Sequence, residues 1–387
     1  MPQLFAPLPP PASKLGYYRK LSTLAGVQLS PIALGGGNIG DKWHEYGMGS
    51  MTKESSFKLL NGYFDLGGNF IDTANDYQDG SSEEFIGEWA EGRDIRDQLF
   101  IATKYTSHVH HHNPKFAQQI LFSGNSAKSM HLSVESSLKR LRTTYLDLLY
   151  IHWWDFTTSI QEIMHALHAL VLARKVLYLG ISDAPAWVVS QANEYAKCNA
   201  LTPFCVYQGK WGILDRSFER DIIPMAQSQG MALAPWGVLG GGRIRTDEEE
   251  ERRRKTGENG RTIFNPEWER TPAEKAVCNA LEKVAKEIGA KHINSVAIAY
   301  VMHKTQFVFP IIGGRSVEHL LTNIEALEIT LTKEQISFIE SSIPFDLGFP
   351  HNIIGDGEGN KLFNSSSGYI DYWPRAQPIK PSKKIEA

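Results

Sequence analysis

The sequence alternates short apolar segments with amphipathic ones, and this alternation repeats eight times. The strand-like segments end near Leu34, Asp72, Lys104, His152, Ser182, Gln208, Trp236 and Gly313. Such alternation indicates a parallel sheet wrapped by helices. Eight repeats, each with a possible helix after the strand, predict a closed α/β architecture, the (β/α)8 or TIM barrel.

Several segments between these strands carry the start signals of helices. Ser159 with Glu162, and Thr271 with Glu274, have the spacing of a capping box, and Pro272 occupies a first helical position. Apolar residues recur at helical spacing as Ile163, Leu167 and Leu170, as Val277, Leu281, Val284 and Ile288, and as Met130, Val134, Leu138 and Leu141. We expect these stripes to pack against the barrel.

The rest of the chain fits a single domain over residues 1–387. Residues 18–30 predict a hairpin that turns at Ala25-Gly26 and plugs the N-terminal mouth of the barrel. We expect the barrel core to span about 18–345 and a C-terminal tail to follow over 346–387. The loops 107–126 and 240–272 have the length of functional lids.

Composition narrows the class of protein. The chain has 42% hydrophobic and 21% charged residues, which suits a globular core. A net charge of -3 gives no reason to expect nucleic acid or anionic membranes as partners. Three widely spaced cysteines and no signal-peptide pattern favour a reducing, cytoplasmic setting without a metal site. The oligomeric state stays open.

Titratable residues stand at the ends of three consecutive predicted strands. Asp72, Lys104 and His152 close the second, third and fourth apolar runs. In such barrels the reactive residues gather at the carboxyl ends of the strands, where the loops meet over one pocket. A buried Asp72–Lys104 ion pair with His152 as a polar partner would explain the same residues without any reaction.

Tyr77 follows Asp72 by five residues, in the loop above the second strand. A phenol ordinarily titrates at about pH 10, but a neighbouring ammonium such as Lys104 stabilises its phenolate. Asp72 would hold that ammonium in place, and neutral His152 would orient a carbonyl oxygen beside the hydroxyl. We therefore expect these four residues to form a pocket that protonates a developing alkoxide.

At this point the sequence resembles the aldo-keto reductase superfamily, from about Leu21 to Leu347. The segments NFIDTANDY, ATKY and LLYIHWWD match the family's Asp, Tyr, Lys and His tetrad in order. GNFIDTANDYQDGSSEEFIGEW, KVLYLGISDAPAWVV and VFPIIGGRSVEHL are similar to the fungal aryl-alcohol dehydrogenase and norsolorinic acid reductase branch. The resemblance implies an NADP-dependent enzyme of secondary metabolism that reduces aromatic or polyketide-like aldehydes and ketones reversibly.

The resemblance also implies positions for the nicotinamide end of NADPH. Ser182 and Gln208 match residues that hydrogen-bond the carboxamide, and Asp183 stands where the family usually has Asn. Trp236 matches an aromatic residue that stacks on the nicotinamide ring. Backbone N–H groups for the pyrophosphate would come from Gly237, Val238, Leu239 and Gly240.

A second group of matched residues concerns the adenosine end. Arg315 and His319 lie near a predicted helix start, where the helix dipole and a guanidinium together favour a phosphate. We expect Arg315 to bind the 2′-phosphate and Asn323 to face the adenine, which favours NADPH over NADH. Thr322 replaces the acidic residue that usually precedes this Asn.

The aromatic residues near the predicted pocket are candidates for substrate contacts. They are Trp43, Tyr105, Trp153 and Trp154. Packing in the barrel would explain any one of them equally well. An alternative function also stays open, because some members of the superfamily act as NADPH-binding, redox-sensing regulatory subunits with little turnover.

Residues 35–40, GGGNIG, satisfy the GxGxxG pattern of a dinucleotide-binding loop. The following segment, DKWHEYGMGSM, has the composition of a loop and does not open a helix, as a Rossmann fold would require. We therefore reject that interpretation. Instead, we expect Gly37 and Asn38 to border the barrel mouth beside the nicotinamide.

Two further patterns are better explained as solvated surface. A loop contains the histidines His108, His110, His111 and His112, without the Cys or carboxylate ligands that would complete a metal site. Residues 247–255, DEEEERRRK, place Glu248–Arg252 and Glu249–Arg253 at helical i,i+4 spacing. They predict an exposed, self-paired helix, and docking of a partner there stays a weaker alternative.

Overall fold

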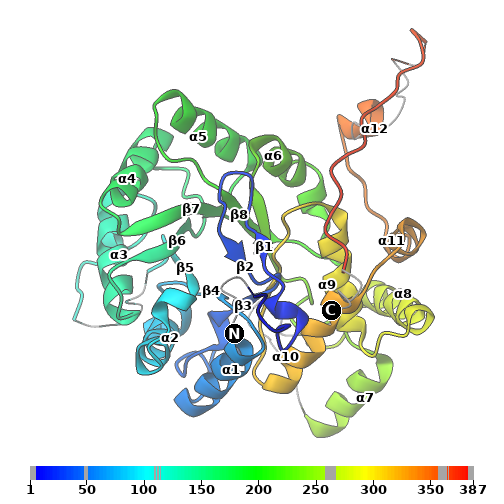
Figure 1. Ribbon diagram of the computed structural model, residues 1–387, viewed down its shortest axis with the longest axis horizontal. Helices are drawn as coiled ribbons and strands as arrows, with labels where there is room; N and C mark the ends of the chain where they lie inside the picture. Colours follow the sequence, from blue (N-terminus) through cyan, green and yellow to red (C-terminus); the bar gives the residue numbers. More distant parts are fainter. Residues whose placement is uncertain are drawn as a thin grey trace.

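The computed structural model describes residues 6–47, 51–108, 110, 113, 115–257, 267–355, 364 and 366–381. Within them, eight parallel strands form a barrel with helices around it (Figure 1). In spatial order the strands are β10 (Ile311–Ile312), β3 (Ala33–Gly35), β4 (Phe70–Asp72), β5 (Phe100–Tyr105), β6 (Leu146–Ile151), β7 (Val176–Ser182), β8 (Val206–Lys210) and β9 (Ala232–Trp236). The (β/α)8 prediction is confirmed, with each strand at its expected place.

Hydrogen bonds between β9 and the residues leading into β10 close the barrel. Leu233 donates its N–H to the carbonyl of Phe307 at 2.9 Å and accepts from the N–H of Phe309 at 2.8 Å. The parallel register brings the carboxyl ends of neighbouring strands side by side, as where Ser182 pairs with Gln208. Side chains from several strands therefore meet at one mouth of the barrel.

Most of the helices lie around the outside of the barrel, whereas α12 lies apart from the strands (Figure 1). The helices are α1 (Lys53–Asp65), α2 (Ser81–Gly92), α3 (Ala127–Arg140), α4 (Ile160–Leu172), α5 (Ala186–Cys198), α6 (Ile222–Gln229), α7 (Asp247–Thr256), α8 (Pro272–Ile288), α9 (Ile293–Lys304), α10 (Val317–Ile324), α11 (Lys333–Glu340) and α12 (His351–Ile354). Both α8 and α10 pack against α9, which is buried along most of its length. Of the helices in the described ranges, none combines the length and the apolar character needed to cross a membrane.

The predicted apolar stripes of α3, α4 and α8 face the core, as expected. The capping box of Thr271 and Glu274 forms in full at the start of α8. At the start of α4 only half of the predicted box forms. Ser159 accepts the N–H of Glu162, but the Glu162 carboxylate accepts the N–H of Ala127 at 3.0 Å. This glutamate links two neighbouring helices.

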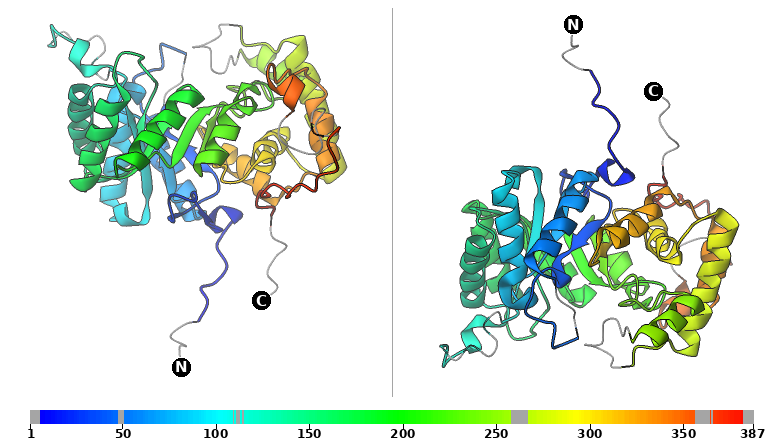
Figure 2. Two further views of the ribbon diagram at one scale, coloured as in Figure 1. Left: turned by 90° about the horizontal axis from the view of Figure 1, so that it is seen from above. Right: turned by 90° about the horizontal axis from the view of Figure 1, so that it is seen from below.

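The N-terminal hairpin consists of β1 (Arg19–Lys20) and β2 (Gln28–Leu29), which pair antiparallel. Leu21 and Ala25 are buried in a cluster at the amino ends of the barrel strands, with Phe70, Phe100, Leu148, Val206 and Phe309. The predicted plug is therefore confirmed. Figure 2 shows the hairpin at the opposite end of the barrel from the short helix η5 (Ile120–Phe122), which belongs to the loop after β5.

Candidate active site

A buried ion pair lies at the mouth of the barrel. The Lys104 Nζ atom is 2.5 Å from Asp72 Oδ1, and it also donates to the carbonyl of Thr73 at 2.7 Å. Both charged side chains are almost completely inaccessible to solvent. Burial opposes charge on the ammonium, but Asp72 and Tyr77 outweigh it and raise the pKa of Lys104. Lys104 therefore stays protonated.

Gln208 holds the second oxygen of the same carboxylate. Its Nε2 group donates to Asp72 Oδ2 at 2.8 Å, across the barrel from β8 to β4. Lys104 and Gln208 thus fix both oxygens of Asp72. The sequence predicted only a cofactor contact for Gln208. Its contact with Asp72 could not be predicted, because the two residues are 136 positions apart in the sequence.

Tyr77 opens the short helix η3 (Tyr77–Gly80) directly above β4. Lys104 Nζ donates to its hydroxyl oxygen at 3.4 Å. The next residue, Gln78, is fully buried with a positive φ of 54°. Its amide oxygen accepts the N–H groups of Lys42 and Trp43, at 3.0 and 2.8 Å. These bonds fix the loop and with it the position of the phenol.

The protonation state of Tyr77 suits a proton donor. Burial raises the pKa of Tyr77 to about 12, although the Lys104 ammonium acts in the opposite direction. The lysine therefore has the expected influence, but burial outweighs it. At neutral pH the phenol carries its proton.

His152 follows β6 and faces Tyr77. The two rings meet edge to face, with centroids 5.8 Å apart. Burial and the neighbouring Lys104 lower the pKa of His152 to about 3, so the imidazole is neutral, as the sequence analysis predicted. Its Nδ1 atom lies 3.3 Å from the hydroxyl of Ser107 and 3.6 Å from Oδ1 of Asp76.

The four candidate substrate aromatics separate into two pairs. Trp43 packs edge to face on Tyr77, and the half-exposed Trp153 donates its indole N–H to Ser107 at 3.1 Å. Tyr105 is fully buried, with its hydroxyl bonded to the carbonyl of Asn125, and Trp154 also packs into the core. Because side chains alternate along a strand, Tyr105 points away from the pocket that its neighbour Lys104 enters.

The nicotinamide end of the predicted cofactor site has the right polar groups. Ser182 lies at the end of β7, and its buried hydroxyl has no hydrogen-bond partner within the described ranges. A buried polar atom without a partner is rare, and a ligand amide would satisfy it. Asp183, with a positive φ of 41°, accepts the indole N–H of Trp236 at 3.3 Å. Ser182 and Asp183 offer polar groups that fit a carboxamide, and Trp236 offers a ring on which a nicotinamide could stack.

Asp183 differs from the asparagine that the family usually has. Desolvation at the barrel mouth raises the pKa of Asp183 to about 6, against the hydrogen bond from Trp236. When ionised, this carboxyl group cannot donate to a carboxamide oxygen. It can still accept from the carboxamide nitrogen, and it keeps the Trp236 ring in place.

A glycine-rich turn follows Trp236. Gly237 and Gly240 both have positive φ, at 72° and 57°, and Val238 between them is buried. The left-handed φ of Gly240 favours glycine, and a Cβ there would lie 2.7 Å from the end of the Leu214 side chain, which would have to shift. The tight turn leaves backbone N–H groups of Gly237, Val238 and Leu239 near the barrel mouth, as a pyrophosphate would require.

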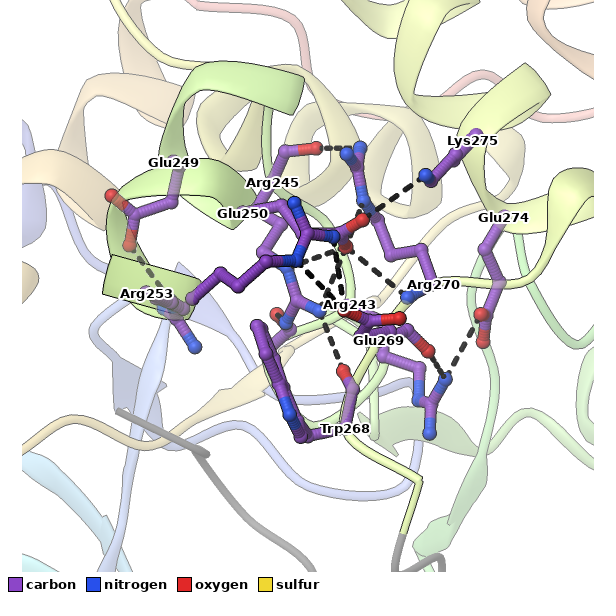
Figure 3. A network of polar contacts seen from close by, with 12 residues as sticks. Arg243, Arg245, Glu249, Glu250, Arg253, Trp268, Glu269, Arg270, Glu274 and Lys275 are labelled. Atoms are coloured by element: carbon purple, nitrogen blue, oxygen red, sulfur yellow. Dashed lines mark hydrogen bonds and ion pairs between the residues drawn. The ribbon is translucent and has the colours of Figure 1, made fainter. Parts of the chain in front are cut away.

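The segment after this turn is anchored by a buried arginine–glutamate network (Figure 3). Glu250 of α7 lies at its centre. The Glu250 Oε2 atom is 2.9 Å from Arg245 and 2.8 Å from Arg270, and Oε1 is 3.2 Å from Lys275. Burial opposes its charge, but the hydrogen bonds from Arg270 and Arg245 lower the pKa of Glu250 to about 2. Arg245 also donates to the carbonyl of Gly242 at 2.9 Å.

This network corrects the prediction for residues 247–255. The segment is the helix α7, and the predicted Glu249–Arg253 pair forms at 2.8 Å. Arg252, however, pairs with Glu249 at i,i+3, where we expected Glu248. The helix is not uniformly exposed either, because Glu250 is buried against two arginines from outside it. The loop 240–272 therefore has a folded core of its own, apart from residues 258–266, which lie outside the described ranges.

The candidate phosphate residues lie at the start of α10. Ser316 caps this helix by accepting the N–H of His319 at 3.3 Å. Arg315 and His319 are exposed beside the cap, while Asn323 is buried in the last turn. A helix N-terminus with an exposed guanidinium beside it suits a phosphate.

The remaining sequence signals fall outside this site or at its border. Residues 36–38 form a short turn and an irregular loop follows them, so no helix completes the GxGxxG pattern. A Cβ on Gly37 would lie 3.9 Å from the Tyr77 ring, and Asn38 lies close to Gly313. His108 and His110 stack on Phe122 and Phe116, whereas His111 and His112 lie outside the described residues.

Two groups near the site escaped the sequence analysis. Asp76 lies beside His152, and Glu83 of α2 is fully buried, where it binds Thr103 at 2.5 Å and Arg140 at 2.8 Å. Arg140 also donates to the carbonyl of Asn75 at 3.3 Å and so braces the loop that carries Tyr77. A glutamate in the first turn of a helix is common in sequences, which is why Glu83 gave no distinct signal.

Comparison with known proteins matches this geometry to one family. The family model described as "Aldo/keto reductase family" matches residues 31–344. The chain is 55% identical to "Aryl-alcohol dehydrogenase [NADP(+)]" of Phanerodontia chrysosporium, over 98% of this chain and 100% of that protein. It is 45% identical to "Norsolorinic acid reductase B" of Dothistroma septosporum, over 95% and 94%. It is 44% identical to "Norsolorinic acid reductase stcV" of Emericella nidulans, over 97% of each.

Proposed function

This chain belongs to the aldo/keto reductase family, and from that premise we propose that it is an NADP(H)-dependent oxidoreductase of aromatic or polyketide-like aldehydes and ketones. One observation carries the proposal. A protonated Tyr77, the Lys104 ammonium 3.4 Å from its oxygen and a neutral His152 converge at the mouth of the barrel. The substrate class rests on the names of the relatives and on the two indole rings, Trp43 and Trp153, that flank these groups.

In the reduction, bound NADPH supplies the hydride to the carbonyl carbon. Tyr77 gives its phenolic proton to the carbonyl oxygen as negative charge develops there. His152 is held near Tyr77 and offers an uncharged N–H to the same oxygen. General acid catalysis of this kind contributes roughly a hundredfold to ten-thousandfold to a rate.

Lys104 supports the proton transfer from behind the tyrosine. When the phenol loses its proton, the ammonium stabilises the phenolate oxygen that remains. Asp72 and Gln208 hold Lys104 in place and keep it charged. Because the transfer is reversible, the same residues would accept the proton of an alcohol during oxidation.

We assign the cofactor by the same residues that the sequence singled out. Ser182, Gln208, Asp183 and Trp236 would hold the nicotinamide, and the turn from Gly237 to Gly240 would receive the pyrophosphate. Arg315 would bind the 2′-phosphate, with His319 beside it and Asn323 toward the adenine. This assignment favours NADPH over NADH, because NADH lacks the phosphate that the guanidinium would pair with.

Replacing Arg315 tests the phosphate assignment. In Arg315→Ala the Kd of NADPH should rise about tenfold to a hundredfold, since one charge-assisted contact is lost. The Kd of NADH should change less than about threefold. Fluorescence titration measures both constants. A variant that binds NADPH as tightly as the parent protein would rule out Arg315 as the phosphate ligand.

We also propose a domain organisation, a cellular location and a partner for the protein. The barrel, its plug and the tail after residue 345 would form one domain, and the cytoplasm would suit its three free cysteines, Cys198, Cys205 and Cys278. The partner we expect is a small aromatic carbonyl compound.

A panel of carbonyl substrates tests the function itself. The protein should oxidise NADPH with aryl aldehydes and ketones, and with a kcat/KM at least tenfold higher than for short aliphatic aldehydes. The oxidation of aryl alcohols with NADP+ should also be measurable. Tight NADPH binding without turnover of any carbonyl would instead support a redox-sensing regulatory subunit.

A further inference from the structure

Asp76, directly before Tyr77, has a carboxyl group that the mechanism above does not use. Its Oδ1 atom is buried and forms no hydrogen bond with any described residue. The Nδ1 atom of the neutral His152 ring lies 3.6 Å from it. A buried, unpaired carboxyl oxygen beside a candidate catalytic ring requires an explanation.

Ser107 connects the two side chains. Its hydroxyl oxygen lies 3.3 Å from Nδ1 of His152 and accepts the indole N–H of Trp153 at 3.1 Å. Hydrogen bonding from Ser107 also acts to lower the pKa of the Asp76 carboxyl, against the larger effect of burial. Because the indole is a donor only, the single hydroxyl proton of Ser107 is free to point toward Asp76 or toward His152. Ser107 can therefore pass a change at Asp76 on to the imidazole.

Resting on the proposed function, we propose that Asp76 is a positioning residue that sets, through Ser107, which ring nitrogen of His152 carries the proton. The ring nitrogen that would face the substrate is Nε2, which lies on the opposite side of the ring from Asp76 and Ser107. Only a protonated Nε2 can donate a hydrogen bond to the substrate oxygen.

The two protonation states of Asp76 orient the hydrogen bonds from Asp76 through Ser107 to His152 in opposite directions. As a neutral acid, Asp76 donates its O–H to Ser107, Ser107 donates to Nδ1, and the imidazole proton lies on Nε2. After Asp76 has lost its proton to solvent, Ser107 donates to the carboxylate and accepts from Nδ1–H. The Nε2 atom then has a lone pair and no proton.

Only the first state helps the reaction. A developing alkoxide is stabilised by a donor, and a lone pair on Nε2 repels it. Because reduction and oxidation cross the same transition state, ionisation of Asp76 should slow both directions by the same factor. A charge-assisted hydrogen bond to a carboxylate favours the unproductive tautomer by about tenfold.

The surroundings of Asp76 set the pH range in which its carboxyl group titrates. Lys104 of β5 lowers its pKa and Glu83 of α2 raises it, while Arg140 of α3 binds the neighbouring carbonyl of Asn75. Burial is the largest influence and raises the pKa of Asp76 to about 6. The switch would therefore occur between about pH 5 and pH 7.

The test compares Asp76→Asn with the parent protein at each pH. The asparagine side chain can donate to Ser107 but cannot ionise. With saturating NADPH and an aryl aldehyde, the kcat ratio of D76N to the parent protein should be close to one at pH 5 and rise to about ten at pH 8. Taking the ratio removes the pH dependence of proton delivery by Tyr77. Oxidation of the alcohol should show the same ratio.

Two further variants separate this positioning role from a structural one. Asp76→Glu keeps an ionisable group and should retain the inflection. Asp94→Asn removes an exposed carboxylate at a left-handed position with φ 54°, which asparagine tolerates, and should leave the pH profile unchanged. A ratio of D76N to parent protein that stays flat from pH 5 to pH 8 would overturn the proposal.

A spectroscopic readout keeps the inference independent of turnover. In protein labelled with ¹⁵N-histidine, the ring nitrogens of His152, assigned with His152→Gln, should exchange protonated and unprotonated signals between pH 5 and pH 8. In D76N the Nε2 signal should stay that of a protonated nitrogen throughout. If the parent protein reduces no carbonyl compound but shows this exchange, the proposed function fails and the tautomer switch stands. A His152 signal that does not change with pH would overturn the switch even in an active enzyme.

Discussion

Lys104 lies between Asp72, Thr73 and Tyr77 with no access to solvent, so its charge there depends on Asp72. Two buried ions of this kind add little net stability as a pair, but breaking the pair leaves one charge uncompensated. We therefore propose that the pair serves the chemistry of the site. It keeps an ammonium beside a phenol.

Removing the ammonium tests this dependence. In Lys104→Met the free energy of unfolding should fall by about 3–5 kcal/mol, because Asp72 stays buried without its cation. Urea denaturation measures this loss. The double variant Asp72→Asn/Lys104→Met should recover most of the stability without recovering turnover. Equal stability of Lys104→Met and the parent protein would contradict the account.

Single residues also show where sequence reasoning reached its limit. Asp72, Lys104 and His152 could be predicted, because each closes an apolar strand and such ends converge in a barrel. The contacts of Asp76 with His152 and of Gln208 with Asp72 could not be predicted, since the partners come from other strands and loops. Tyr105 was a candidate by proximity alone, although strand alternation next to Lys104 already indicated the opposite direction.

At the scale of elements, the helix α7 depends on residues outside itself. Its sequence is almost entirely charged, so no apolar stripe indicated a buried face. Glu250 is buried because Arg245 and Arg270 reach it from both ends of the loop. The eight strands, in contrast, could be predicted because their apolar runs are local signals.

The arginine–glutamate network should control how firmly the turn from Gly237 to Gly240, the proposed pyrophosphate site, is held in place. In Glu250→Gln, the buried Arg245 guanidinium loses its counter-ion while Arg270 keeps its ion pair with Asp247, which should lower the free energy of unfolding by roughly 3 kcal/mol. We expect the Kd of NADPH to rise about tenfold, because the turn from Gly237 to Gly240 loses its anchor through Arg245. Single-turnover rates at saturating NADPH should stay within about threefold of the parent protein.

Glu249→Gln is the matched control. Glu249 lies on the same helix and pairs with the partly exposed Arg252 and Arg253, so its loss should change stability by less than about 1 kcal/mol. Its NADPH affinity should not change. If both variants weaken NADPH binding equally, the buried network does not anchor the loop.

At the scale of the whole molecule, the two ends of the barrel have separate tasks. The hairpin closes the amino ends of the strands with apolar side chains, while the carboxyl ends carry the polar site. The tail also reaches the closed end, where Gln306 donates to the carbonyl of Gln377 at 2.9 Å. The apolar closure and the polar site therefore lie at opposite ends of the barrel.

Shortening the tail tests this separation. Ending the chain after Leu347 keeps Phe345, which lies against Arg216 and Arg220. The shortened protein should unfold in one cooperative transition and lose no more than about 3 kcal/mol, with kcat within about twofold of the full chain. Thermal unfolding and steady-state turnover measure these values. A shortened chain that folds but does not turn over would show that the tail belongs to the site.

In the proposed mechanism, Tyr77 gives the proton to a carbonyl reduced by NADPH. Stopped-flow oxidation of NADPH by an aryl aldehyde tests it with Tyr77→Phe, which removes one hydroxyl and keeps the ring. We expect an unchanged Kd for NADPH and a rate of reduction lower by about a hundredfold to ten-thousandfold. A Tyr77→Phe protein that binds NADPH normally and reduces the aldehyde at the parent rate would rule out Tyr77 as the proton donor.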